Sequence, residues 1–153
     1  MIELKNTRFG DLQLDEGAEI RFPRGIFGFP DETRFALLER EKGHVSFLQS
    51  LNTPALALPV IDGSLIRPEY PDQAREDVAA LANFANAEHL VVLVVVRVEP
   101  NERLLRGNLV APILVDAEAR LGCQVMLDSG KYSVDVVLGQ PSGGASVESP
   151  SAR

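Results

Sequence analysis

The chain has 153 residues, one cysteine and a formal net charge of −7. This length suits one ordinary domain, and a lone cysteine cannot form an intrachain disulfide, which fits a reducing compartment. The longest apolar run, residues 90–96, is far shorter than the about 20 residues that a membrane-spanning helix needs. Residues 1–6 carry charge where a secretion signal needs an apolar segment, so we expect a cytoplasmic protein with no membrane segment.

The acidic balance bears on which partners the protein binds. There are 22 acidic and 15 basic residues, and the sequence pI is near 4.8. A surface of this sign repels phosphate backbones, so direct binding to nucleic acid is not expected. It suits a basic protein partner, although the same charge also serves simply to keep a protein soluble.

The first third of the chain predicts strands and one unusual loop. Apolar and polar residues alternate at 2–5, 11–14 and 18–22, which is the pattern of half-buried strands. Residues 23–30 contain two glycines and two prolines, so they favour neither a helix nor a central strand. This loop is nevertheless apolar, and such a loop either plugs the core or offers a contact surface.

The middle of the chain predicts further strands at 34–41, 44–51 and 55–61, followed by one helix. Apolar residues at helical spacing place this helix at 73–84, with Asp72 as its N-cap. Residues 90–96 are continuous and rich in valine, which indicates a strand covered on both faces.

The last third predicts three more strands and a tail. Pro112 interrupts a strand at 109–115, which indicates an edge strand or a bulge because proline cannot donate to a ladder. Strands at 123–127 and 132–138 flank a turn at 128–131, which predicts a hairpin. From residue 139 the composition is rich in serine, glycine and proline, so residues 139–153 are predicted to be a disordered tail.

These elements predict an all-β, mostly antiparallel fold of about nine strands with one short helix, in a single domain at residues 1–138. Turns at regular spacing are typical of a sandwich or a barrel, and the pattern alone does not choose between them.

The sequence lacks the motifs of common catalytic chemistry. It has no phosphate loop and no serine-nucleophile elbow, and one cysteine with two distant histidines does not make a zinc pattern. We therefore expect no enzyme, no metal and no cofactor. His44 and His89 are interpreted as polar surface groups, and Cys123 as an inert, buried thiol.

Four segments, in order, resemble the FliW family of flagellar assembly factors. Residues 22–29 read Phe-Pro-Arg-Gly-Ile-Phe-Gly-Phe and are similar to the loop Phe-Pro-x-Gly-Ile-x-Gly-Phe of that family. Residues 47–50 match its Phe-x-x-Leu-Gln-Ser strand in part. Residues 106–113 contain Asn-Leu-x-Ala-Pro, and residues 120–127 contain Arg-x-Gly-x-Gln. Together they span most of residues 1–138.

The resemblance implies a compact protein, a small closed or partly open β-barrel, without a catalytic site. It also implies binding to flagellin in the cytoplasm and, when flagellin is absent, binding to the translational regulator CsrA, whose repression of flagellin synthesis is thereby relieved. Each partner would lower the amount of protein available to the other. We expect a monomer when neither partner is bound.

The resemblance and the local pattern together suggest site residues. The loop side chains Ile26, Phe27 and Phe29 are predicted to contact flagellin, or to plug the core. The acidic turns are predicted to form the CsrA face, with plain solvated charge as the alternative; they are Asp11, Asp15, Glu16, Asp31 and Glu32. Structural roles are predicted for Asn108, Pro112 and Gln124. Two other functions remain open, a small carboxylate-dependent β-barrel enzyme and an RNA-binding barrel.

Overall fold

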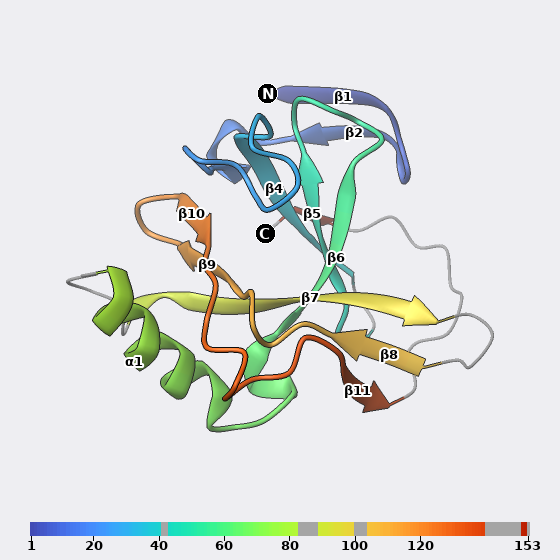
Figure 1. Ribbon diagram of the computed structural model, residues 1–153. Helices are drawn as coiled ribbons and strands as arrows, with labels where there is room; N and C mark the ends of the chain where they lie inside the picture. Colours follow the sequence, from blue (N-terminus) through green and yellow to red (C-terminus); the bar gives the residue numbers. More distant parts are fainter. Residues whose placement is uncertain (41–42, 83–88, 100–103, 140–150, 153) are drawn as a thin grey trace.

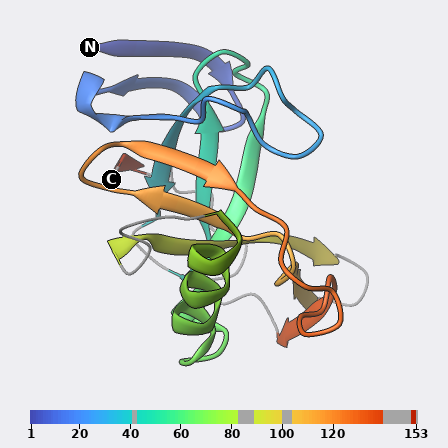
Figure 2. The same ribbon diagram turned by 60° about the vertical axis from the view of Figure 1, so that its left-hand side comes forward.

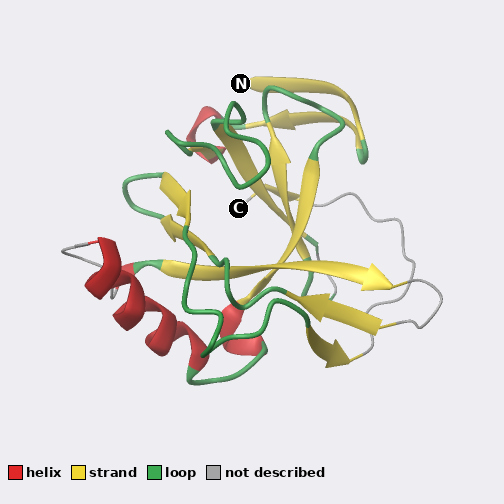
Figure 3. Cartoon of the chain, viewed as in Figure 1, coloured by secondary structure: helices red, strands yellow, loops and turns green. Residues whose placement is uncertain are grey.

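The computed structural model describes residues 1–40, 43–82, 89–99, 104–139 and 151–152 (Figure 1). One α-helix, α1 (Tyr70–Ala82), and two short 3-10 helices, η1 (Glu16–Ala18) and η2 (Gly63–Leu65), accompany the strands in this part of the chain (Figure 3). The strands described are β1 Ile2–Thr7, β2 Gly10–Leu14, β3 Glu19–Arg21, β4 Arg34–Glu39, β5 Ser46–Ser50, β6 Ala57–Asp62, β7 Val91–Glu99, β8 Leu104–Gly107, β9 Ile113–Asp116, β10 Leu121–Gln124, β11 Val136–Gly139 and β12 Ser151–Ala152.

Seven of these strands close into a ring. Hydrogen bonds run in the order β3, β4, β5, β6, β7, β9 and β10, and β10 returns to β3. The β10–β3 pair is parallel, whereas the other pairs in the ring are antiparallel. The prediction of a small, mostly antiparallel β-barrel with one helix is confirmed.

Strand β7 organises the barrel because it pairs with three neighbours in succession. Its first residues pair with β9, its middle residues with β6, and its end, Val96–Glu99, with β8. Strand β11 then continues the sheet beyond β8. Leu93 points into the barrel, whereas Val92 and Val94 pack on the cluster that includes α1 residues. Burial of both faces explains why residues 91–96 of this strand are all apolar.

Three apolar clusters lie in layers around the sheet. The barrel interior includes Phe22, Phe35 and Leu48, all fully buried. A second cluster joins α1 to β7 and β9, and the helix lies along this side of the barrel in Figure 2. The third joins the β1–β2 hairpin to the other face of β4, through Ala36 and Leu38.

The helix begins earlier than predicted. Tyr70, not residue 73, is its first residue, and Asp72 lies inside the first turn, where its carboxylate pairs with Arg75 at 2.6 Å. Asp72 is therefore not the N-cap. Pro71 fits within the first turn because backbone N–H groups there have no helical partner to lose.

The predicted hairpin around residues 128–131 is wrong. A local turn does form, since the N–H groups of Lys131 and Tyr132 both donate to the carbonyl of Asp128 at 3.0 Å. However, β10 pairs with β9 and β3, and β11 pairs with β8, an unpredicted strand. The strand predicted at 109–115 is shorter, because β9 begins only after Pro112.

The predicted tail, residues 139–153, is described only in part. Gly139 ends β11, and Ser151 and Ala152 pair with Glu39 and Leu38 of β4. Strand β3 pairs with β4 only as far as Ala36, so this end of β4 has a free edge that β12 covers. Residues 140–150 and 153 lie outside the described residues.

Candidate functional site

The apolar loop at 23–30 and the segment before β9 meet at Gln124, on β10. Its side-chain oxygen accepts a hydrogen bond from the backbone N–H of Phe27, 97 residues away, at 2.8 Å. Its side-chain nitrogen donates to the carbonyl of Ala111 at 3.0 Å. One glutamine thereby joins the apolar loop at 23–30 to the segment that precedes β9.

The apolar loop has a defined conformation that requires glycine. The backbone groups of Ile26 and Phe29 bond each other in both directions, at 3.2 and 2.9 Å, and make an isolated bridge. Gly25 has a φ of +67°, and a Cβ at this position would lie 2.5 Å from the carbonyl oxygens of Phe29 and Pro30. A side chain at position 25 would therefore strain the backbone and collide with it.

The three apolar side chains of the loop differ in their exposure to solvent. Ile26 is 4% exposed and packs in the barrel interior near Phe22, so it is part of the core and not of a surface. Phe27 and Phe29 are 49% and 44% exposed. One residue of the loop therefore plugs the barrel, whereas the two aromatic rings face solvent.

Asn108 and Pro112 shape the chain between β8 and β9. The Asn108 side-chain oxygen accepts a hydrogen bond from the backbone N–H of Val110 at 3.0 Å, and the backbone N–H of Asn108 donates to the carbonyl of Val95 at 3.1 Å. Pro112 lies before the strand, and its carbonyl accepts from the N–H of Val125 at 3.2 Å. Proline is tolerated at this place because no ladder bond needs its missing N–H.

The acidic turns at the start of the chain lie at opposite ends of one strand. Asp11 follows the β1–β2 turn, where its carboxylate accepts from the N–H of Asn6 at 2.9 Å. Asp15 and Glu16 follow the far end of β2, and Glu16 lies 3.3 Å from the terminal ammonium of Met1. Asp11 and Asp15 are four residue steps apart along the strand, which is about 13 Å, so these carboxylates do not form one tight cluster.

Asp31 and Glu32 differ from each other in their surroundings. Asp31 is exposed, whereas Glu32 is half-buried. The Glu32 carboxylate accepts from the hydroxyls of Ser50 at 2.6 Å and Thr53 at 2.5 Å, and it thereby holds the turn after β5 against the loop before β4. Glu32 consequently has a structural role that the sequence pattern did not indicate.

Cys123 and the two histidines differ in their exposure to solvent. Cys123 is half-buried and not fully buried as predicted, and this burial raises the pKa of its thiol, while the nearby positive charge of Arg24 offsets only part of the effect. The thiol is therefore protonated at neutral pH, a state of low nucleophilicity. His44 and His89 are exposed.

A polar cluster that sequence analysis missed joins α1 to the turn before β11. The Tyr132 hydroxyl donates to the Asp77 carboxylate at 2.6 Å, and the Lys131 ammonium lies 3.0 Å from the same oxygen. The hydrogen bond from Tyr132 and the charge of Lys131 together hold the pKa of Asp77 below its usual value. Asp77 and Tyr132 are 55 residues apart, so no spacing could have indicated the pair.

Tyr70 completes this cluster on its buried side. Its hydroxyl donates to the carbonyl of Leu109 at 2.8 Å, and its ring meets that of Tyr132 edge-on, with centroids 5.7 Å apart. Burial, more than the neighbouring phenol, raises the pKa of Tyr70. Both phenols therefore act as neutral donors that join α1 to the segments before β9 and β11.

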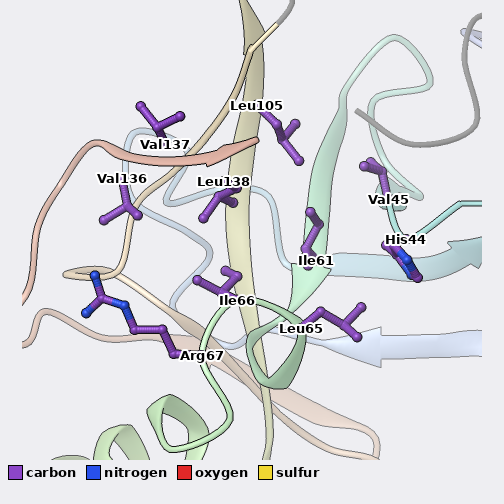
Figure 4. A pocket seen from close by; sticks show the side chains of 10 residues that line it. All are labelled: His44, Val45, Ile61, Leu65, Ile66, Arg67, Leu105, Val136, Val137 and Leu138. Atoms are coloured by element: carbon purple, nitrogen blue, oxygen red, sulfur yellow. The ribbon is translucent and has the colours of Figure 1, made fainter. Parts of the chain in front are cut away.

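A pocket of about 320 Å³ lies on another side of the molecule, among η2, β8 and β11 (Figure 4). Eight of the ten lining residues are aliphatic and none carries a carboxylate, although polar atoms supply slightly more of the accessible surface than apolar atoms do; the residues are His44, Val45, Ile61, Leu65, Ile66, Arg67, Leu105, Val136, Val137 and Leu138. In the described part of the chain, no three His, Cys, Asp or Glu residues lie together as a metal site would require. Nor does any described helix have the length and apolarity to cross a membrane.

Comparisons with known proteins agree on one family. Residues 3–138 match the sequence model of the FliW protein family. A flagellar assembly factor FliW from Syntrophus aciditrophicus is 33% identical over 134 residues, which cover 87% of this chain and 85% of that protein. A second, from Caldanaerobacter subterraneus, is 31% identical over 135 residues, with coverage of 87% and 90%.

A solved structure extends the likeness to the fold. A crystal structure of the flagellar assembly factor FliW superimposes with a TM-score of 0.74 at 29% identity, and the match covers 92% of this chain and 99% of that chain. These relatives are named as assembly factors and not as enzymes. The barrel, the loop held by Gln124 and these matches lead to one conclusion: the chain belongs to the FliW family of flagellar assembly factors.

Proposed function

We propose that this protein binds flagellin in the cytoplasm and, when flagellin is absent, binds CsrA and relieves its repression of flagellin synthesis, with no catalysis of its own. Family membership supports the role in flagellar assembly. The observation that carries the binding proposal is the aromatic pair Phe27 and Phe29, which is about half exposed on a loop whose backbone is held in place.

An exposed aromatic pair on a rigid support is the kind of feature that anchors protein interfaces. Aromatic anchors are enriched among interface residues that contribute most of the binding free energy. Because Gln124 and the Ile26–Phe29 bridge already hold the loop, little conformational entropy is lost when a partner binds. We assign this surface to flagellin.

The acidic surface supports the second partner. CsrA is an RNA-binding protein with a basic surface, which a chain of net charge −7 attracts. Asp11, Asp15, Glu16 and Asp31 are exposed carboxylates that could face it. Glu32 is a weaker choice, because two hydroxyl groups already occupy its carboxylate.

The test of the flagellin surface is the double variant Phe27→Ala with Phe29→Ala. We expect its affinity for purified flagellin to fall by at least about tenfold, as for loss of an interface anchor. The melting temperature should change little, because both rings are already half in water. Calorimetric titration measures the first quantity and thermal unfolding the second.

A matched control removes exposed apolar side chains elsewhere. Val98→Ala with Val134→Ala deletes side chains that are 48% and 62% exposed, and it should leave flagellin binding unchanged. Equal affinity of the loop variant and the wild type would refute the assignment of the loop. Absence of binding to both flagellin and CsrA at micromolar concentration would refute the function itself.

A further inference from the structure

The pocket among η2, β8 and β11 differs in charge from the rest of the molecule. Acidic residues outnumber basic ones 22 to 15 along the chain, but the pocket lining has no carboxylate and contains Arg67 and His44. Arg67 is exposed, and its guanidinium makes no hydrogen bond or ion pair with another described residue. It is therefore available to a carboxylate from outside.

The floor of the pocket is aliphatic. In Figure 4 the side chains of Ile61, Ile66 and Leu138 converge on the hollow, while Arg67 lies at one side and His44 at the other. A volume of about 320 Å³ is at the small end of ligand sites, which span roughly 300–1,000 Å³. It suits one or two aliphatic side chains and is small for a larger ligand.

Taken together, the two features define a ligand chemistry. An aliphatic floor removes apolar side chains from water, and a cation at the rim selects a carboxylate beside them. We propose that this pocket is a second protein-docking site, which takes leucine-like side chains of a partner segment whose neighbouring carboxylate pairs with Arg67. The site is separate from the Phe27–Phe29 loop and does not depend on the assignment of that loop to flagellin.

The charge at the rim also separates this partner from a basic one. A cationic partner would be placed beside Arg67 with like charges facing each other, which weakens association. The pocket therefore favours acidic, amphipathic segments, whereas the exposed acidic turns favour basic surfaces. Two surfaces of opposite preference on one small protein permit two partners to be bound through different contacts.

The test uses the full chain and two short blocked peptides of opposite charge. The probes are acetyl-Glu-Leu-Leu-Glu-amide and acetyl-Lys-Leu-Leu-Lys-amide, each titrated into ¹⁵N-labelled protein. We expect the acidic peptide to shift the amide signals of Ile66, Leu105 and Val137, and to bind about fivefold more tightly than the lysine peptide. The signals of Phe27 and Phe29 should not move.

Two charge-reversal variants make the result specific. Arg67→Glu should abolish or invert the preference for the acidic peptide, and the exposed side chain makes loss of the fold unexpected. Lys5→Glu makes the same change in net charge on β1, on the opposite side of the molecule in Figure 1, and should keep the preference.

Several results would overturn the proposal. Absence of localised shifts, equal binding of the two peptides, or an unchanged preference in Arg67→Glu would each do so. Nuclear Overhauser contacts between the pocket methyl groups and residues 140–150 of the same chain would show that its own segment fills the pocket. Pocket shifts that depend on protein concentration, without peptide, would instead point to a second copy.

Discussion

The Phe27–Phe29 loop and the pocket beside Arg67 present apolar surface in opposite ways. In the loop, aromatic rings project outward from a backbone that glycine and Gln124 hold. In the pocket, aliphatic side chains line a hollow and a cation lies at its edge. A projecting surface depends on the backbone beneath it, whereas a hollow depends on the ends of side chains, and the two should respond differently to substitution.

The largest effect is expected for Gly25→Ala in the loop. The new Cβ would meet carbonyl oxygens of the backbone at 2.5 Å in a left-handed conformation. Overpacking and left-handed strain together should lower the free energy of unfolding by about 3 kcal/mol. Urea unfolding measures this free energy. Gly17→Ala is the control, because nothing lies within 4 Å of the new Cβ atom. A loss below about 1 kcal/mol would show that the loop yields easily.

A smaller effect is expected when the support of the loop is removed. Gln124→Ala deletes the acceptor of the Phe27 N–H and the donor to Ala111. Two hydrogen bonds of ordinary strength amount to about 1–2 kcal/mol of stability. Hydrogen exchange at the Phe27 amide should also become faster, whereas Gln13→Ala, at an exposed position on β2, should change neither quantity. Unaltered exchange at the Phe27 amide would mean that the bridge between Ile26 and Phe29 holds the loop in place without Gln124.

The matching substitution near the pocket is Gly107→Ala. Its Cβ would lie 2.9 Å from the end of the Leu138 side chain and 3.1 Å from that of Val94. These groups can rotate away, so we expect a loss of only about 1 kcal/mol, at the low end for overpacking. Because Leu138 lines the pocket, binding of the acidic peptide should weaken. A loss as large as that of Gly25→Ala would remove the distinction between the two regions.

The smallest effect concerns the polar cluster that anchors the segment before β11. Folding lowers the pKa of Asp77. The ionised carboxylate therefore stabilises the folded state at every pH above the pKa of a free carboxyl group. This stabilisation is lost as the pH falls through the lowered pKa of the folded state. Asp77→Asn should reduce stability at pH 7 by at most about 1 kcal/mol. The difference from wild type should shrink on acidification.

Unfolding of Asp77→Asn and wild type at neutral and at acidic pH checks this sign. Glu76→Gln is the control, because it removes a neighbouring, exposed carboxylate of the same helix. A difference between Asp77→Asn and wild type that grows as the pH falls would contradict the proposed linkage.

Much of the fold followed from local pattern. Alternation at Leu12 and Leu14 and the apolar run of β7 correctly indicated strands, because burial on one face or on both leaves a periodic trace in the sequence. The residues of the loop at 23–30 also indicated both of its possible roles. Which of its side chains turned inward did not follow, because that depends on the space inside the closed barrel.

Other features were decided only by tertiary structure. Strand β11 pairs with β8 and not with its predicted hairpin neighbour, and Tyr132 bonds to a helix 55 residues earlier. The bridge made by Gln124 and the pocket beside Arg67 likewise bring together residues far apart in the chain. The periodicity of apolar residues indicates which side chains are buried, but it does not indicate which other residues they pack against. Strand partners and binding surfaces therefore appear only when the ring of strands has closed.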